Sequence, residues 1–343
     1  MSEANPAIAD PVRVGVIGAG RIGASHATLL ATRVPGARLV AVADARPDAA
    51  RDLAGRLGCR AHPSPADLLA DESVEAVVIA ASTAAHAALV VASAEAGKAV
   101  FCEKPMGMDL DDIDRGIAAA AAAEVPLQVG FNRRFAPDFA AAHRLVVDGA
   151  VGTPQLLRSV TRDPGLADPA AVPAGTIFTQ TLVHDFDTVL WMNPGAEPVS
   201  VYATADALVA PDFKAAGLLD TAVVVVTFDN GAIAVVEASF SATYGYDVRA
   251  EVFGSGGMVT MGDAVPTSVR HSDGSGRHGA TSRSDTELLR DAYVGELAEL
   301  AAATREGRAP SVTGTDARRA LSLALAAIRS VETGQPVRLE VAR

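Results

Sequence analysis

A short apolar run, a cluster of three glycines and a helical pattern follow one another near the start of the chain, and few folds accommodate that order. The β-branched run from Val12 to Ile17 predicts a buried strand. It leads directly into Gly18-Ala19-Gly20-Arg21-Ile22-Gly23, which has the pattern G-x-G-x-x-G. Apolar spacing over Ile22 to Thr32 predicts that this cluster opens a helix. A strand, a glycine-rich turn and a helix in this order are typical of a dinucleotide-binding unit.

Each of the three glycines has a physical reason in such a unit. Gly18 would make the tight turn, and Gly20 would let a pyrophosphate approach the backbone. Gly23 would allow the helix to pack closely on the strand. The phosphates would then lie at the helix N-terminus, where Arg21 and Ile22 begin the first turn and free N–H groups favour anions.

An acidic residue 21 positions after Gly23 predicts which dinucleotide is bound. Asp44 ends a second predicted strand, Arg38 to Ala43, which is the place for a carboxylate that binds the adenine ribose hydroxyls. A carboxylate there repels a 2′-phosphate, so we expect NAD rather than NADP. Arg46, two residues later, would partly offset that repulsion and leaves NADP as the alternative.

The first 131 residues alternate strand and helix patterns, and the strands are apolar at consecutive positions. Such strands indicate a parallel sheet covered on both faces, so residues 1–131 are predicted to form an α/β, doubly wound Rossmann domain. The further strands are expected at Glu75–Ala81, Ala99–Cys102 and Leu127–Phe131, and the helices at Ala49–Leu57, His86–Ala96 and Leu110–Ala123.

Residues 132–343 change in character and predict an α+β domain on an open, mostly antiparallel sheet that binds substrate and mediates oligomerisation. Asp229-Asn230-Gly231 between two apolar runs is a strong hairpin signal. The expected strands are Gln155–Thr161, Val199–Ala205, Thr221–Phe228, Ala232–Phe240, Val248–Phe253 and Gly256–Met261, and the expected helices are Ala136–Asp148, Glu287–Arg305 and Asp316–Glu332.

Two segments of this half carry separate expectations. Thr221 to Val226 is almost continuously apolar, so we expect both faces of that strand to be covered, one of them by a second subunit of a homodimer or homotetramer. His271 to Thr286 is polar and rich in Gly and Ser, which predicts an exposed loop.

Composition excludes several classes of function. A net charge of −12 without a basic cluster argues against nucleic acid and anionic membranes as partners. Only two cysteines occur, which argues against a disulfide framework or a cysteine-based metal site and favours the cytoplasm. No apolar run has the length of a membrane helix, and no cluster of His, Asp and Glu has the spacing of a metal site.

Lys104 ends the run Val100-Phe101-Cys102-Glu103-Lys104-Pro105, and the carboxyl ends of strands are where open α/β sheets bind ligands. Oxidation of a secondary alcohol needs an acid or base near the reacting oxygen, and a lysine there would stabilise a developing alkoxide. A surface lysine that merely follows a strand is the alternative.

A second candidate lies in a largely apolar helix predicted around Leu182 to Leu190. His184 has a side chain that titrates near neutral pH and suits a general base for an alcohol. Gln180 and Asp187 lie four and three residues away, so all three would share one helix face. A buried histidine with an ordinary hydrogen bond is the alternative.

Four motifs occur together in a specific order. They are the glycine cluster, Glu103-Lys104-Pro105, Gly130-Phe131-Asn132-Arg133-Arg134-Phe135 and His184-Asp185-Phe186-Asp187. Over nearly its whole length the chain resembles the glucose–fructose oxidoreductase/inositol dehydrogenase/MocA family, most closely its inositol 2-dehydrogenase branch. Segments around Tyr244 and Tyr293 are also similar to that branch.

The resemblance implies an NAD(P)-dependent dehydrogenase that oxidises a ring hydroxyl of inositol or a related cyclitol to a ketone. It implies Lys104 as the catalytic lysine, which also contacts the cofactor, and His184 as the acid/base. Further implied contacts are to the cofactor, by Thr83, His86 and Glu103, and to the substrate, by Arg133, Gln180, Asp187 and Tyr244.

The chain departs from the branch at one informative position. The branch usually has an aspartate four residues before the histidine, where this chain has Gln180. An amide adds no negative charge, so Asp187 or a substrate hydroxyl would have to orient His184. The exact substrate is therefore open. A sugar or glycoside dehydrogenase is an alternative, because relatives with the same framework oxidise pyranose hydroxyls. A non-catalytic NAD-binding regulator is a third possibility, which retention of Lys104 and His184 disfavours.

Overall fold

The computed structural model describes residues 10–165, 172, 174–209, 211–215, 217–262 and 269–339. The chain divides into two compact units. The first contains the described residues up to Gly130 together with Tyr293–Thr315, and the second contains Phe131–Ala292 and the described residues from Asp316 onward. The sequence predicts contiguous ranges, whereas the contacts place Tyr293–Thr315 in the first unit. None of the helices in the described ranges is both long enough and apolar enough to cross a bilayer.

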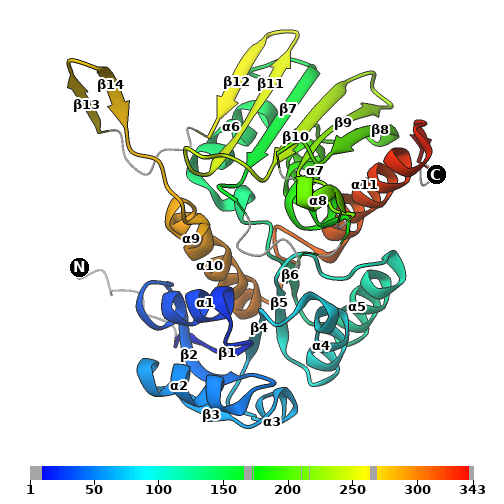
Figure 1. Cartoon of the computed structure of the whole chain (residues 1–343). Helices are drawn as coiled ribbons and strands as arrows, with labels where there is room; N and C mark the ends of the chain where they lie inside the picture. The colour runs from blue at the N-terminus through cyan, green and yellow to red at the C-terminus, as the bar shows by residue number, and fades with distance from the viewer. Residues whose placement is uncertain are drawn as a thin grey trace, which may run out of the picture. The chain divides into compact units, whose positions relative to one another are not determined.

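The first unit is built on a six-stranded parallel sheet (Figure 1). Its strands lie in the order β3-β2-β1-β4-β5-β6, so the winding direction reverses between β1 and β4, as in a doubly wound fold. This confirms the predicted Rossmann architecture. The strands are β1 (Val12–Ile17), β2 (Ala37–Ala43), β3 (Arg60–His62), β4 (Ala76–Ile79), β5 (Ala99–Cys102) and β6 (Leu127–Val129).

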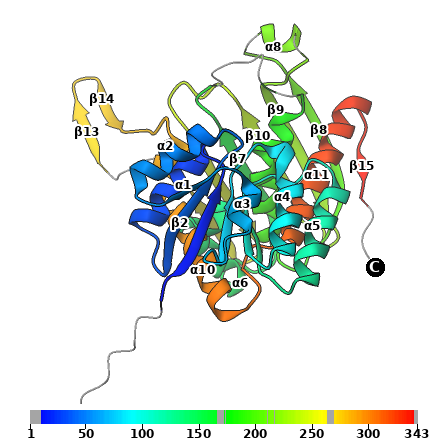
Figure 2. The same cartoon turned by 90° about the horizontal axis from the view of Figure 1, so that it is seen from below.

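Helices cover both faces of the central strands, because every residue of β4 and β5 is buried although successive side chains point to opposite faces. Helix α1 packs on β1 and β2. Helix α4 packs on β4 and β5, and α5 lies beside α4 (Figure 2). The helices of this unit are α1 (Arg21–Thr32), α2 (Pro47–Leu57), α3 (Pro65–Leu69), α4 (Thr83–Glu95), α5 (Leu110–Ala122) and, from Tyr293 on, α10 (Arg290–Glu306).

Local sequence sets where these helices begin and end. Pro47 opens α2, and Gly58 ends it in the left-handed conformation, with a φ of +68°. The side chain of Asp109 caps α5 by accepting the backbone N–H of Asp112 at 2.7 Å.

The second unit holds a seven-stranded sheet in the order β12-β11-β7-β10-β9-β8-β15. All of its neighbours are antiparallel except β7 and β10, so the predicted mostly antiparallel sheet is confirmed, with one parallel pair. The strands are β7 (Pro154–Arg162), β8 (Pro198–Asp206), β9 (Thr221–Phe228), β10 (Ile233–Ser239), β11 (Asp247–Gly254), β12 (Gly257–Met261) and β15 (Val337–Arg338).

Helix packing buries one face of this sheet, and the described residues cover the other face less completely. Helix α7 packs on β7 and β10, and along β9 Val224 and Val226 are buried while Val223 and Val225 are half-buried. One face of β9 is therefore not fully covered by the part of the chain that the structure describes. The helical segments of the unit are η1 (Asn132–Phe135), α6 (Pro137–Val147), η3 (Ile177–Leu182), α7 (Val183–Trp191), α8 (Pro211–Ala215), α9 (Asp285–Leu288) and, from Asp316 on, α11 (Gly314–Thr333).

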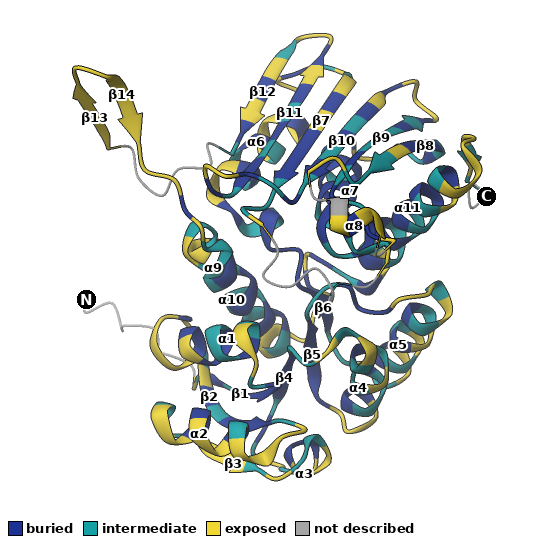
Figure 3. Ribbon diagram, in the orientation of Figure 1, coloured by how far each residue is buried: buried dark blue, intermediate teal, exposed yellow. Residues whose placement is uncertain are grey.

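Two hairpins test the sequence signals. The Asn230-Gly231 hairpin is confirmed: Gly231 has a φ of +86°, and the N–H of Phe228 donates to Ala232 O at 3.0 Å. The loop expected over His271–Thr286 is wrong in part, because β13 (Arg270–Asp273) and β14 (Gly276–Gly279) pair there. Both strands are exposed along their length (Figure 3), so no apolar alternation marked them in the sequence.

Candidate active site

The turn after β1 has the geometry that close approach to a ligand requires. Gly18 has a φ of +112°, and a Cβ there would lie 2.4 Å from Ala80 O. A Cβ on Gly23 would lie 2.0 Å from Gly18 O, so only glycine permits the helix to approach the turn this closely. A Cβ on Gly20 would meet nothing within 4 Å, so the space in front of this glycine is open.

That open space belongs to a cavity of about 650 Å³ at the N-terminus of α1. Gly20 caps α1 without a side-chain hydrogen bond, so the first-turn amides have no side-chain cap in front of them and favour an anion. The lining near the turn comes from the start of α1 and from the loops after β1, β2 and β4, and it includes Gly18, Gly20, Arg21, Ile22, Asp44 and Ser82.

Asp44 lies at the edge of this cavity with both carboxylate oxygens held by the backbone. Its Oδ2 accepts the N–H of Ala19 at 2.6 Å, and its Oδ1 accepts the N–H of Arg46 at 2.8 Å. The Arg46 guanidinium is exposed and lies 3.6 Å from Oδ1. The carboxylate is therefore fixed in position, and its remaining lone pairs can accept ribose hydroxyls. A glycine cradle, a helix N-terminus and a fixed carboxylate together fit a dinucleotide.

The loop after β4 carries two of the other predicted cofactor residues. Thr83 is the first residue of α4 and is half-buried. His86 is buried, and its ring lies between two carbonyl oxygens, Pro105 O at 2.8 Å from Nδ1 and Ala81 O at 3.1 Å from Nε2. His86 thus links the loop after β4 to the loop after β5, and neither residue lines the cavity at the turn.

Lys104 and Glu103 follow β5 directly, and the peptide bond between Lys104 and Pro105 is cis. The Lys104 side chain is half-buried. Glu103 accepts the backbone N–H of Lys104 at 3.2 Å through Oε2, and its Oε1 lies 2.6 Å from Nε2 of His26. Its carboxylate is therefore engaged inside the unit.

The structure also brings in two residues that sequence reasoning missed. His26, Glu103 and Glu296 form a buried group whose ligand-type atoms lie within 4.8 Å of one another. The available signal was an acid in the apolar stripe of α10, since Glu296 lies between Tyr293 and Leu297. Nothing in the local sequence connects that acid to α1.

In the second unit, the segment from Ile177 to Leu190 is buried at every position except Gln180 and His184. Gln180 lies in η3, which has π-helical hydrogen bonding, and His184 lies in the first turn of α7. Such π turns occur often at functional sites. The ring of Phe131 packs edge-on against His184 at 6.0 Å. An otherwise buried helix therefore presents one amide and one imidazole, four residues apart.

Arg133 is buried beneath this helix rather than free at a surface. Its Nη1 donates to Oδ1 of Asp185 at 2.8 Å, and its Nη2 donates to Oγ1 of Thr161. Asp185 also accepts the hydroxyls of Ser159, at 2.5 Å, and Thr161, at 2.7 Å. Arg133 thus belongs to a satisfied buried network, and its predicted substrate contact stays a prediction.

Asp187 has a similar structural role. Arg134 donates to both of its oxygens, at 2.9 Å from Nε and 2.5 Å from Nη2, and also bonds Asp316 at 2.9 Å. Burial raises the pKa of Asp187, although the charge and hydrogen bonds of Arg134 oppose the shift. Because its carboxylate is engaged, Asp187 has little capacity left to orient His184.

Tyr244 is half-exposed in the segment before β11 (Asp247–Gly254). Its hydroxyl donates to Oδ2 of Asp247 at 2.8 Å. The hydroxyl is therefore fixed by its own unit, and contact with substrate stays a prediction.

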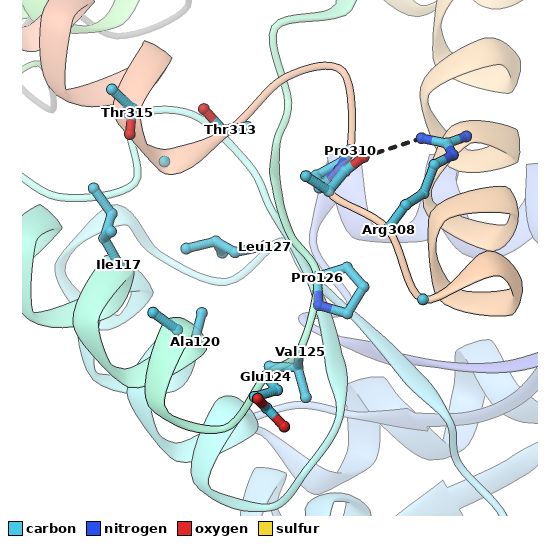
Figure 4. A pocket seen from close by; sticks show the side chains of 14 residues that line it. Ile117, Ala120, Glu124, Val125, Pro126, Leu127, Arg308, Pro310, Thr313 and Thr315 are labelled. Carbon is cyan, nitrogen blue, oxygen red and sulfur yellow. Dashed lines mark hydrogen bonds between the residues drawn. The ribbon is translucent and has the colours of Figure 1, made fainter.

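A second cavity, of about 280 Å³, lies elsewhere in the first unit (Figure 4). Its walls include Ile117 of α5, Leu127 at the start of β6 and Thr313. The start of β6 is the amino end of a parallel strand, so this cavity lies at the opposite edge of the sheet from the glycine turn. The nearby Arg308 is paired with Glu299 at 2.7 Å, and no predicted site residue lines the cavity.

Residues 12–131 match the profile described as an oxidoreductase family with an NAD-binding Rossmann fold. Residues 139–260 match the GFO/IDH/MocA C-terminal domain.

Similar proteins cover nearly the whole chain. Myo-inositol 2-dehydrogenase of Thermotoga maritima is 40% identical over 96% of this chain and 99% of its own. Inositol 2-dehydrogenase of Rhizobium meliloti is 39% identical over 93% and 97%. The solved structure of scyllo-inositol dehydrogenase from Lactobacillus casei, with bound NAD(H) and scyllo-inositol, superposes with a TM-score of 0.91 at 26% identity, covering 96% of this chain and 99% of that one.

These matches and the cradle at the glycine turn confirm the family predicted from the four motifs. The chain belongs to the Gfo/Idh/MocA family of oxidoreductases, with an NAD-binding Rossmann domain.

Proposed function

We propose that this protein is an NAD-dependent dehydrogenase that oxidises a ring hydroxyl of inositol or a related cyclitol to a ketone. The cradle of Gly18, Gly20 and Asp44 is the observation that carries the dehydrogenase assignment. The substrate class is supported by relatives at 39–40% identity that are named inositol 2-dehydrogenases.

The proposed chemistry divides between two side chains. His184, one of the two residues not fully buried along its helix, takes the proton from the substrate hydroxyl as general base. Lys104, at the carboxyl end of β5, donates a hydrogen bond to a substrate oxygen and stabilises developing negative charge. NAD, when bound, accepts the hydride from the substrate carbon.

Cofactor contacts are proposed for Arg21, Ile22, Thr83 and His86 in addition to the cradle. Glu103 and Lys104 complete the cofactor side. Substrate contacts are proposed for Gln180, Arg133, Asp187 and Tyr244. The last three have fewer hydrogen-bonding positions left for a substrate, because their polar atoms already have partners.

A sugar or glycoside dehydrogenase is the second candidate, and Gln180 is the observation that favours it. The side chain is half-buried beside the proposed base, where the inositol branch usually has an aspartate. A neutral amide donates as well as accepts hydrogen bonds, so it would recognise a different arrangement of ring oxygens from a carboxylate.

We also propose that the protein acts as a homodimer or homotetramer in the cytoplasm. The low cysteine count supports the location. Oligomerisation is supported by a row of exposed apolar side chains across four adjacent strands of the open sheet face. The register aligns Met258, Phe253, Leu156 and Ile233 in that row. Such a row is typical of an interface rather than of a solvated surface.

A panel of inositols, cyclitols, pyranoses and glycosides, assayed with NAD and NADP in parallel, tests the proposed function. Turnover of one or more inositols with NAD, followed as NADH absorbance, is expected. Faster turnover of a pyranose would favour the second candidate. A protein that binds NAD but turns over no polyol or sugar would instead be a regulator.

A further inference from the structure

His26, Glu103 and Glu296 form a buried group in which only Glu103, a proposed cofactor contact, has a part in the reaction proposed above. These side chains come from α1, the end of β5 and α10, and their ligand-type atoms lie within 4.8 Å of one another. His26 and Glu296 are both 0% exposed. An ionised side chain is costly to bury unless it is paired. The protonation states of these three side chains therefore determine how much free energy their burial costs.

Glu296 lacks the partners that an ionised carboxylate needs. Neither of its side-chain oxygens has a hydrogen-bond partner among the described residues, although its backbone carbonyl accepts Nε2 of Gln128 at 2.8 Å. Burial raises the pKa of Glu296 well above its usual range, and the charge of Glu103 raises it further. The protonated form avoids placing a second anion in the group.

Glu103 lies in the opposite situation. Burial disfavours its charge, but the hydrogen bond from His26 and the charges of His26, Lys104 and His86 outweigh burial and lower the pKa of Glu103. The pKa values of the two carboxyl groups are therefore driven apart, so that Glu103 is an anion and Glu296 is a neutral acid.

Glu103 is also confined on several sides. His26 holds Oε1 at 2.6 Å, and a Cβ on Gly130 would lie 3.3 Å from Oε2. Because Oε2 accepts the backbone N–H of Lys104, movement of the Glu103 carboxylate would displace the peptide that carries Lys104.

We propose that Glu296 is an uncharged carboxylic acid in the working enzyme and that it positions Lys104 through Glu103. The proposal rests on the role of Lys104 given above. A neutral Glu296 leaves Glu103 as the single anion facing His26, Lys104 and His86. Ionisation of Glu296 at high pH would place two like charges within 4.8 Å, push Glu103 away and impair Lys104.

The geometry favours a proton over a metal ion in this group. Nε2 of His26 and Oε1 of Glu103 are 2.6 Å apart, which is a hydrogen-bond distance. Two ligands of one tetrahedral ion, each bound at about 2.1 Å, lie roughly 3.4 Å apart.

Infrared spectroscopy of the whole enzyme tests the protonation state without relying on turnover. The wild type at pH 7 should show a carboxylic-acid C=O band that Glu296→Gln removes. Glu306→Gln, on the exposed part of the same helix, should retain the band. Absence of a band that depends on Glu296 would overturn the proposal, as would one equivalent of tightly bound metal that is lost in Glu296→Gln.

The pH dependence of the free energy of unfolding, compared between the wild type and Glu296→Gln, provides an independent readout. A carboxyl group whose pKa is raised in the folded state binds more protons when folded, so stability falls as pH rises above the unfolded pKa of about 4.3. Glu296→Gln should remove that part of the pH dependence, whereas Glu306→Gln should leave it. Equal pH dependence in the wild type and Glu296→Gln would contradict a neutral Glu296.

Kinetics test the positioning role. Glu296→Gln should keep kcat near the wild-type value at pH 7 and lose less activity at high pH. Glu296→Ala should lower kcat by up to about 10²-fold through misplacement of Lys104, with KM for NAD little changed. A loss in Glu296→Gln at pH 7 as large as that in Glu296→Ala would overturn the positioning role.

If the wild type turns over no polyol or sugar, the proposed function fails, while infrared spectra and stability still decide the state of Glu296.

Discussion

The backbone N–H of Ala19, inside the glycine turn, donates to Oδ2 of Asp44 at 2.6 Å. This bond joins the turn after β1 to the end of β2, so the glycine turn and the Asp44 carboxylate are held together. Asp44 therefore supports the turn in addition to its proposed role in recognising the ribose.

Asp44→Ser should lower kcat/KM for NAD and relax the preference over NADP. A hydrogen bond to a charged group contributes about 1.5–3 kcal/mol, so we expect a fall of about 10–10²-fold with NAD. The activity with NADP should fall less or rise, because the repulsion of the 2′-phosphate is removed. Asp48→Ser, on an exposed turn of α2, is the matched control. A wild-type enzyme that uses NADP as well as NAD would contradict this reading of Asp44.

Lys104→Ala and His184→Ala should each lower kcat by about 10²–10⁴-fold, because each removes a positioned acid, base or hydrogen-bond donor. NADH affinity, measured by titration calorimetry, should stay unchanged in His184→Ala and fall much less than kcat in Lys104→Ala, since the glycine turn and Asp44 remain. Lys214→Ala and His271→Ala, both at exposed side chains, are the controls. Wild-type turnover in His184→Ala would exclude it as the base.

Gln180→Asp separates two roles for the amide. If Gln180 orients His184, an aspartate four residues away should favour the charged imidazole and move the rising limb of the pH–rate profile to higher pH. If Gln180 contacts substrate, the order of preference among inositols and pyranoses should change with little movement of the profile. An unchanged profile and an unchanged substrate order would remove Gln180 from the site.

Asp185→Ala should destabilise the protein by about 3–5 kcal/mol, because it leaves the buried Arg133 charge without its partner. Urea unfolding followed by circular dichroism measures the change. Asp48→Ala breaks an exposed pair with Arg51 and should cost about 1 kcal/mol or less. A similar small cost for Asp185→Ala would mean that the network around Arg133 is not important for stability.

Phe253→Glu combined with Leu156→Glu should dissociate the proposed oligomer, because both side chains lie in the apolar row on the open sheet face. Light scattering at micromolar concentration measures the mass against that of the 35.0 kDa chain. Leu145→Glu, at an exposed position on α6, should leave the assembly intact. A wild-type monomer under the same conditions would refute the oligomer.

The sequence predicts regular elements well where the local pattern is strong. The bounds of β1, β5 and β9 agree with the predicted residues, because β-branched runs bounded by turn residues are unambiguous. It misses β13 and β14, whose exposed side chains carry no apolar alternation. The π-helical turn around Gln180 also has no local signature, although the helix itself was predicted.

By itself, the sequence determined the Rossmann unit, the cofactor preference expected from Asp44 and the candidate pair Lys104 and His184. These features depend on short motifs whose chemistry is local, such as glycines at positions where the backbone conformation or a close approach excludes a larger residue. Only the tertiary structure decided that Arg133 and Asp187 are already paired, and that α10 packs in the first unit with Glu296 beside His26 and Glu103. The physical reason is that the partner of a buried charge is chosen by three-dimensional packing between segments far apart in the chain, and no local spacing encodes it.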